Sequence, residues 1–200
     1  LFDDPKRGEE ARRVFDDAQR LLSEIVDRPL LRADGVIGLY PAASDGDDIV
    51  LYADESRERE RMRLPQLRNQ QADRERNLSL ADFVAPLGSG VKDYVGAFAV
   101  TAGLGLEELA GRYRSEGDDY RAIMAKLLAD RLTEAFAEAL HRYARVTLWG
   151  YEREGQWSVG DLLAEKYQGI RPAFGYPSAP DHSLKADVFA LMDVGTVTGM

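Results

Sequence analysis

The longest regular pattern in the chain is a repeat of apolar residues between positions 118 and 144, and it constrains the fold most. Spacings of three and four place these residues on one side of a helix, so the pattern predicts a long helix. Asp118 and Asp119 suit its first turn, where acidic side chains meet the positive end of the helix dipole. The repeating residues are Ile123, Leu127, Leu128, Leu132, Phe136 and Leu140.

Strand-like patterns elsewhere in the chain predict that the fold also contains a sheet. The β-rich runs 35–43 and 48–54 are separated by the turn cluster 44–47, which predicts a hairpin. The sequence therefore predicts a mixture of helices and strands. Further strands are expected at 80–85, 93–101 and 146–149, and further helices at 6–26, 106–114, 158–167 and 186–192. Ser158 is expected to start its helix, with Asp161 three residues on as in a weak variant of the capping box.

The composition of the 200 residues narrows the classes of function. A net charge of −9 argues against a nucleic-acid-binding protein, which needs a basic surface. With no Cys and only His141 and His182, the chain cannot form disulfides, thiolate metal sites or a His-rich metal site. No run approaches the ~20 apolar residues of a membrane helix, and the N-terminal residues lack the layout of a signal peptide. Neither nucleic acid nor a membrane is therefore an expected partner.

Residues 55–77 are nearly all polar, and arginines alternate there with acidic residues. Such mixed charge is typical of a solvent-exposed helix, here with an interruption at Pro65. Docking of an acidic partner on the arginines is the alternative.

Gly103 and Gly105 lie between a predicted strand and a predicted helix, as in a nucleotide-binding turn. Glu108 occupies the place of the motif's third glycine, where its side chain would block and repel a phosphate. An ordinary turn is the favoured interpretation, and an unrelated nucleotide enzyme is the alternative.

The segment 169–183 is the strongest candidate for a functional site. Pro172, Pro177 and Pro180 exclude regular structure from it. Ordered irregular loops of this kind often carry function. His182 near its end is as suited to fixing a turn as to touching a ligand.

Four residues of this segment match the needs of a zwitterionic nucleoside such as S-adenosylmethionine. Arg171 offers a planar fork to a carboxylate. Ala173 and Gly175 are small, so their backbone atoms can approach a ligand closely. Tyr176 offers an aromatic face to a cation.

Residues 171–177, RPAFGYP, resemble the R-P-A-P-G-Y-P signature of the activation domain of cobalamin-dependent methionine synthase. Similar segments follow in family order along nearly the whole chain. They are GVIGLYPA at 35–42, DDIVLYADESR at 47–57, LADFVAP at 80–86, DYVGAFAVT at 93–101, the helix at 118–141, WGY at 149–151 and KYQGIRPAFGYP at 166–177.

The resemblance implies an α+β fold, namely a C-shaped single domain with a bent, mostly antiparallel sheet flanked by helices. Residues 1–200 would form one activation domain that lacks the family's extreme N-terminal and C-terminal segments. The domain would bind S-adenosylmethionine and support reductive methylation of cob(II)alamin to methylcobalamin, as part of a cytoplasmic methyltransferase of methionine biosynthesis. Its partners would be a separate cobalamin-binding domain, which holds the cobalamin, and flavodoxin or an equivalent reductase.

The resemblance also implies roles for the loop residues. Arg171 would pair with the carboxylate of the ligand's methionine part. Ala173 and Gly175 would meet the adenosine through backbone atoms, with Tyr176 beside them. No catalytic residue or metal ligand is expected in this chain, since the sulfonium itself is the electrophile and the protein's task is orientation.

Outside the loop, Glu134 matches a family acid that would face the ligand's positive end, and Glu165 and Asp130 match acids of less certain role. The chain departs from the family at Phe174, where the signature has Pro. Because the family pattern extends beyond both ends of the chain, the alternative function is a truncated or stand-alone relative that docks on a cobalamin-binding protein.

Overall fold

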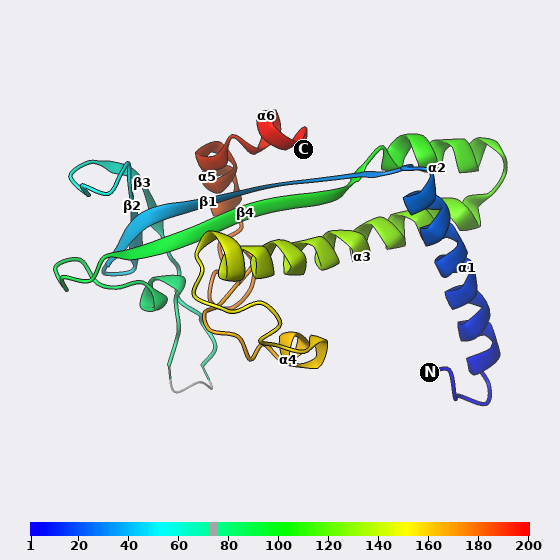
Figure 1. Cartoon of the computed structure of the whole chain (residues 1–200), viewed down its shortest axis with the longest axis horizontal. Helices are drawn as coiled ribbons and strands as arrows, with labels where there is room; N and C mark the ends of the chain where they lie inside the picture. Colours follow the sequence, from blue (N-terminus) through cyan, green and yellow to red (C-terminus); the bar gives the residue numbers. More distant parts are fainter. Residues whose placement is uncertain (73–75) are drawn as a thin grey trace. The chain divides into compact units, whose positions relative to one another are not determined.

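The computed structural model describes residues 1–72 and 76–200 (Figure 1). Residues 73–75 of the arginine-rich segment lie outside the described residues. The chain divides into two compact units, of which unit 1 comprises residues 1–35, 100–150 and 200, and unit 2 comprises residues 36–99 and 151–199. Each unit has its own apolar core.

The four strands form one sheet in the order β3-β2-β1-β4. β1 and β2 pair in an antiparallel hairpin, with Ala42 opposite Leu51 and Asp45 opposite Asp48. β2 and β3 are also antiparallel, and Figure 1 shows β1 and β4 as two long neighbouring strands. The predicted hairpin and the α+β class with an antiparallel sheet are confirmed. The strands are β1 (Arg32–Asp45), β2 (Asp48–Tyr52), β3 (Glu60–Pro65) and β4 (Asp93–Leu104).

Unit 1 is built on three helices, all close to their predicted positions. α2 packs against α3, and α1 packs against α3 as well. Leu21 and Ile25 of α1 share one buried cluster with Leu109 of α2. The helices are α1 (Gly8–Asp27), α2 (Leu106–Ser115) and α3 (Asp119–Tyr143).

The first half of α3 buries a different side from the one that its large apolar residues mark. Ile123 and Leu127 are 61% and 60% exposed. Ala122, Ala125 and Ala129 are buried instead. Because an alanine side chain is small, it allows neighbouring backbone to approach closely and gain many weak attractive contacts. The spacing thus predicted the helix correctly but not its buried side.

The core of unit 2 is formed by one face of the sheet and by helices near the C-terminus. Ile49 and Leu51 of β2 are each 1% exposed and belong to one cluster with Leu184 and Leu191. The last α-helix was not predicted, because its sequence VGTVT is rich in residues of low helix propensity. The helices of unit 2 are α4 (Val159–Leu163), α5 (Leu184–Met192) and α6 (Val194–Thr198).

Two predicted strands are wrong. Residues 80–85 contain a 3-10 helix, η1 (Leu80–Phe83), which begins at a capping box formed by Ser79 and Asp82. Residues 146–149 largely belong to a π-helix, η2 (Ala144–Leu148), which continues α3. In both places the apolar composition is also compatible with a strand. The hydrogen bonds of the capping box decide the conformation at η1, and the preceding helix α3 decides it at η2.

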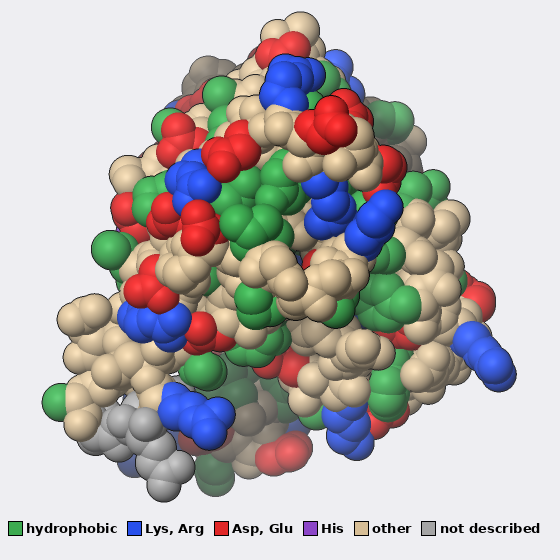
Figure 2. Space-filling model, turned by 90° about the vertical axis from the view of Figure 1, so that its left-hand side faces the viewer, with side chains coloured by type: hydrophobic (Ala, Val, Ile, Leu, Met, Phe, Trp, Pro, Cys, Tyr) green, Lys and Arg blue, Asp and Glu red, His purple; other side chains and the backbone are tan. Residues whose placement is uncertain are grey.

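The arginine-rich segment is not the solvated helix that its charges predicted. Its residues 60–65 form strand β3, and Arg57 makes interior contacts. The Arg57 guanidinium donates to the carbonyl oxygens of Ala42 (2.8 Å) and Asp93 (2.6 Å) and lies over two tyrosine rings. Figure 2, which faces the end of the molecule that bears β2 and β3, shows acidic and basic side chains interspersed rather than gathered into one basic patch.

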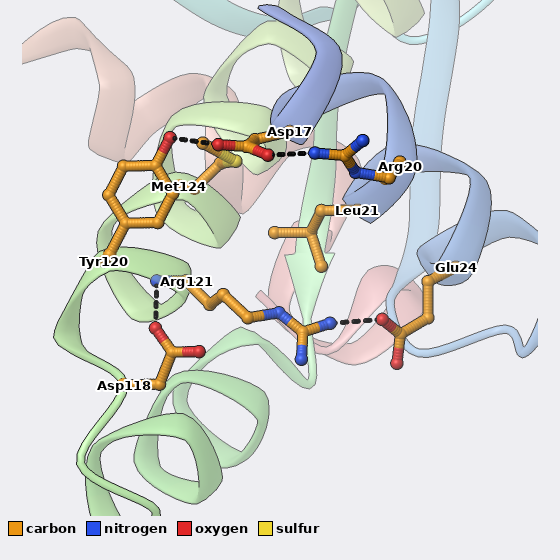
Figure 3. Close-up of a pocket in the computed structure, with 8 residues that line it drawn as sticks. All are labelled: Asp17, Arg20, Leu21, Glu24, Asp118, Tyr120, Arg121 and Met124. Atoms are coloured by element: carbon orange, nitrogen blue, oxygen red, sulfur yellow. Dashed lines mark hydrogen bonds and ion pairs between the residues drawn. The ribbon is translucent and has the colours of Figure 1, made fainter. Parts of the chain in front are cut away.

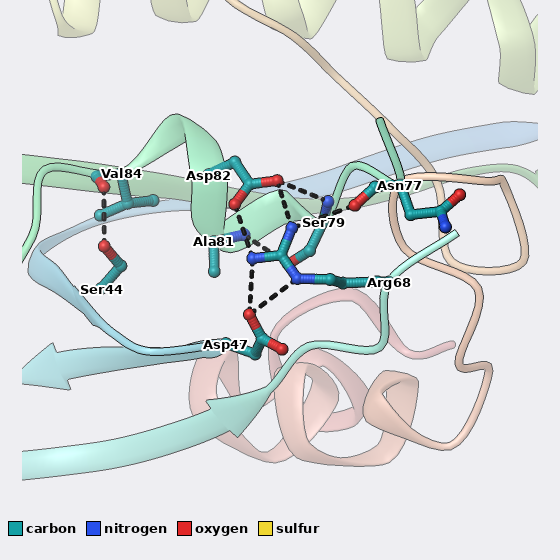
Figure 4. Close-up of polar contacts among 8 residues, drawn as sticks. All are labelled: Ser44, Asp47, Arg68, Asn77, Ser79, Ala81, Asp82 and Val84. Atoms are coloured by element: carbon teal, nitrogen blue, oxygen red, sulfur yellow. Dashed lines mark hydrogen bonds and ion pairs between the residues drawn. The ribbon is translucent and has the colours of Figure 1, made fainter. Parts of the chain in front are cut away.

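Arg68 of the same segment ties two parts of unit 2 together (Figure 4). Its guanidinium donates to the Asp47 carboxylate at 2.6 and 2.9 Å and to both carboxylate oxygens of Asp82 at 2.8 Å. The backbone N–H of Ser79 donates to the same Asp82 side chain at 2.9 Å. The hydrogen bond from Arg68, together with that from Ser79, holds the pKa of Asp82 below its usual value.

We expect the Arg68–Asp82 pair to make part of the stability depend on pH. The pKa of Asp82 is lower in the folded chain than the value of about 3.9 in an unfolded chain. The pair therefore stabilises the fold above the unfolded pKa, and this contribution disappears as the pH falls through the folded pKa. Arg68→Ala should lower the thermal midpoint at neutral pH, and the difference from wild type should close in acid.

Thermal unfolding followed by circular dichroism between neutral and acidic pH measures this difference. Arg76→Ala is the matched control, since it removes the same charge from the same segment. A difference between wild type and Arg68→Ala that stays constant with pH would contradict the assignment.

Candidate functional site

The candidate loop lies in unit 2 between α4, which begins at Val159, and α5, which begins at Leu184. Ser158 and Asp161 form a capping box at the start of α4, as their spacing predicted. Hydrogen bonds from Lys166 and Ser158 lower the pKa of Asp161 to about 2. α4 ends at Leu163, earlier than the predicted position 167, and Glu165 beyond it adopts a left-handed conformation (φ +52°).

Residues 173–179 of the loop form a tight turn that requires glycine at position 175. The backbone N–H of Gly175 donates to the carbonyl of Ala179 (2.8 Å), and the N–H of Ala179 donates to the carbonyl of Tyr176 (2.9 Å). The N–H of Tyr176 donates to the carbonyl of Ala173 (3.2 Å). Gly175 has φ +101°, a conformation that side-chain-bearing residues rarely adopt.

One side chain anchors this turn to the core of unit 2, and a second is buried. Phe174 packs against the cluster formed by the sheet, α5 and α6, and Ala179 is 3% exposed. The structure thus gives a reason for Phe174 in place of the signature's proline, because the ring adds buried apolar area. The loop is ordered by packing as well as by its prolines.

The remaining loop residues differ in exposure. Tyr176 is 63% exposed and Ala173 is exposed, whereas Arg171 is half-buried. A half-buried guanidinium beside exposed backbone and an exposed phenol ring can offer a charged fork, polar backbone groups and an aromatic face to one ligand. The structure places Arg171, Ala173, Gly175 and Tyr176 in one segment of unit 2, as the sequence requires.

His182 makes a contact with the turn that sequence reasoning left open. A β-carbon added to Gly175 would lie 2.2 Å from Nε2 and 2.4 Å from Cε1 of the His182 ring. The imidazole therefore occupies the space beside the Gly175 α-carbon. A glycine within the signature, followed seven residues later by a histidine, was the only sign of this contact in the sequence.

The predicted acids outside the loop are all on the surface. Glu134 lies on α3 in unit 1, and 65% of its side chain is exposed. Its carboxylate oxygen Oε2 forms an ion pair with the guanidinium nitrogen Nη1 of Arg131 at 2.9 Å. Asp130 is exposed on the same helix, and Glu165 is exposed after α4 in unit 2. Their role toward a ligand stays a prediction.

Of the two glycines considered for a nucleotide turn, Gly103 and Gly105, the second has a packing role. Gly105 precedes α2 with φ +93°, and a β-carbon there would lie 3.3 Å from the carbonyl oxygen of Leu30. Glu107 and Glu108 occupy the first turn of α2, where they would repel a phosphate. The geometry favours the ordinary turn.

A pocket of about 460 Å³ in unit 1 was not anticipated from the sequence (Figure 3). Its charged groups satisfy one another: Arg121 pairs with Glu24, and Asp17 pairs with Arg20 and accepts from the Tyr120 hydroxyl at 3.0 Å. The hydrogen bond from Arg20 lowers the pKa of Asp17, and burial raises the pKa of Tyr120. None of the residues predicted for the ligand site lines this pocket.

Two kinds of feature are absent from residues 1–72 and 76–200. These residues include no group of three or more His, Asp or Glu side chains placed to hold a metal ion. No helix among them combines the length and the apolar content that spanning a bilayer demands.

Comparisons with known proteins agree with the motif resemblance. A family model described as "Vitamin B12 dependent methionine synthase, activation domain" matches residues 1–200. The crystal structure of the MetH reactivation domain bound to AdoHcy matches with a TM-score of 0.93 and 47% sequence identity, over 99% of this chain and 61% of that chain. The present chain thus spans less than two thirds of the length of that relative. It belongs to the family of vitamin B12-dependent methionine synthase activation domains.

Proposed function

We propose that this chain binds S-adenosylmethionine through the loop 171–176 and supports reductive methylation of cob(II)alamin to methylcobalamin. The observation that carries the proposal is the 47% identity with a reactivation domain whose structure was determined with AdoHcy bound. AdoHcy is the product that remains when S-adenosylmethionine gives up its methyl group. Cobalamin, held by a separate domain, supplies the cobalt centre that accepts the methyl group, and flavodoxin or an equivalent reductase supplies the electron.

The local geometry supports a division of roles within the loop. We assign the ligand's carboxylate to Arg171, because a guanidinium fork matches a carboxylate in two parallel hydrogen bonds. The Gly175 N–H is used inside the turn. We therefore assign adenosine recognition to the backbone N–H of Ala173 and the carbonyl of Gly175, with the exposed Tyr176 ring beside the ligand.

Glu134 is proposed to face the positive end of the ligand, and its present pairing with Arg131 is compatible with that role. The pair is exposed and joins two residues one turn apart on α3, so breaking it costs little. A carboxylate at this position could therefore change partners when a sulfonium or ammonium group arrives.

Calorimetric titration of S-adenosylmethionine into the purified chain tests the proposed function. We expect saturable binding of one ligand, and competition by S-adenosylhomocysteine because both molecules share the adenosine and the amino-acid end. Adenosine triphosphate is the control ligand, since it shares the adenosine but lacks the carboxylate for Arg171. A chain that binds none of them would contradict ligand binding and favour the alternative function of a docking module for a cobalamin-binding protein.

The reductive role has its own test. A cob(II)alamin-loaded cobalamin-binding domain, S-adenosylmethionine and a one-electron reductant should give methylcobalamin and S-adenosylhomocysteine when the chain is present. Absorption spectra of the cobalamin follow the conversion. Ligand binding without any acceleration of this conversion would contradict the reactivation role while leaving the binding role intact.

A further inference from the structure

We propose that His182 is a positioning residue of the S-adenosylmethionine site, which sets the conformation of the turn at Gly175. The proposal rests on the proposed function of the loop 171–176. Nothing in the ligand's chemistry requires a histidine at this place. The inference comes from the contact between the His182 ring and the Gly175 backbone.

While the His182 imidazole keeps this position, there is no room for a side chain at position 175. A β-carbon on Gly175 would lie 2.2 Å from Nε2, 2.4 Å from Cε1 and 3.2 Å from Cδ2 of His182. Distances below 3.0 Å require one group to move. The imidazole edge thus lies against the α-carbon of Gly175 and restricts the space available to the turn at this residue.

The backbone that carries this ring is held by the start of α5. The Asp181 carboxylate accepts from the backbone N–H of Ser183 (2.8 Å) and from its hydroxyl (2.7 Å). The backbone carbonyl of His182 accepts from the N–H of Lys185 (3.2 Å). Leu184 is 3% exposed in the core of unit 2. The backbone of His182 is therefore fixed by the start of α5, and its ring, although exposed, lies against Gly175.

This arrangement connects the core to the part of the loop that would meet the ligand. Phe174 packs against the core cluster and Ala179 is buried, one before and one after Gly175 and Tyr176. Between these two residues, the conformation of Gly175 decides where its carbonyl points and where the Tyr176 ring projects. Without the imidazole the turn could relax, because the packing of Phe174 and Ala179 fixes its ends but not its middle. Ligand affinity should then fall while the core stays intact.

A double-mutant cycle tests the contact. His182→Ala should weaken S-adenosylmethionine binding about tenfold, measured by calorimetry at a temperature at which every variant is folded. Gly175→Ala should weaken binding more, because it adds both a collision with the imidazole and backbone strain at φ +101°. The double variant should bind more tightly than the product of the two single losses predicts, since His182→Ala removes the collision and leaves only the strain.

Gly169→Ala is the matched control. Gly169 lies in the same loop with φ +90°, but the atom nearest to an added β-carbon is the Tyr151 hydroxyl at 3.5 Å. Its effect on affinity should be the same with and without His182. His182→Gln, whose amide reaches about as far as Nε2, should recover part of the affinity lost in His182→Ala.

The outcomes separate this inference from the function on which it rests. Wild type that binds while the losses at 175 and 182 simply multiply would overturn the role of His182 and leave the proposed function standing. His182→Ala that lowers the thermal midpoint but leaves the dissociation constant unchanged would also overturn it, as a purely structural residue. Wild type that does not bind S-adenosylmethionine overturns both proposals together.

Discussion

Arg171→Ala is expected to weaken S-adenosylmethionine binding by about 10- to 100-fold. The substitution would remove the proposed pairing of the guanidinium with the ligand's carboxylate. Because both hydrogen bonds come from one guanidinium, we count the pair as a single charged interaction, which contributes about 1.5–3 kcal/mol. A tenfold change in the dissociation constant corresponds to about 1.4 kcal/mol. Calorimetry of S-adenosylmethionine binding to wild type and variant measures the loss.

Two further variants make the result specific to the guanidinium fork. Arg171→Lys keeps the positive charge but loses the planar fork, so its affinity should lie between those of wild type and Arg171→Ala. Arg153→Ala removes an exposed arginine of the same unit, outside the loop, and should leave binding unchanged. Equal affinity of wild type and Arg171→Ala would exclude Arg171 from the ligand site, provided that both proteins have the same thermal midpoint.

The largest effect on stability is expected for Leu51→Ala. Leu51 is 1% exposed on β2, inside the cluster that joins the sheet to α5. Truncation leaves a cavity that a packed core closes only in part, and buried Leu→Ala changes lower the free energy of unfolding by about 2–5 kcal/mol. Denaturant unfolding followed by circular dichroism measures the change.

The matched control for this experiment is Leu163→Ala at the end of α4. Leu163 belongs to the same unit but is 81% exposed. The same atoms are removed without a cavity, so the free energy of unfolding should change by less than about 0.5 kcal/mol. Similar losses at both positions would show that the Leu51 cluster does not form the core of unit 2.

Local sequence signals predicted the hairpin and helices α1 to α5 because each is decided largely by neighbouring residues. The spacing of three and four predicted α3, Ser158 and Asp161 predicted the start of α4, and the cluster 44–47 predicted the turn between β1 and β2. Residues 80–85 and 146–149 were wrong as strands, because short apolar runs do not distinguish a strand from other buried segments. The spacing of Ser79 and Asp82 is that of a capping box, which indicates the start of a helical segment at η1.

The arginine-rich segment shows where local signals fail. Alternating charges at 57–63 suit a solvated helix and a sheet edge equally well. Pairing with β2 decides between them, and that partner lies elsewhere in the sequence. Arg57 and Arg68 find carbonyls and carboxylates that only the folded chain brings near.

For the site, the sequence by itself determined the composition of the loop and, through its motifs, the family of the chain. The sequence indicated the candidate ligand-binding residues because they lie close together in one segment whose prolines exclude regular structure. These residues are Arg171, Ala173, Gly175 and Tyr176. Only the tertiary structure decided that Phe174 is an anchor, that α3 buries alanines, and that the His182 ring occupies the space beside Gly175. These facts depend on which surfaces meet across the fold, and packing between residues distant in sequence leaves no local pattern to recognise.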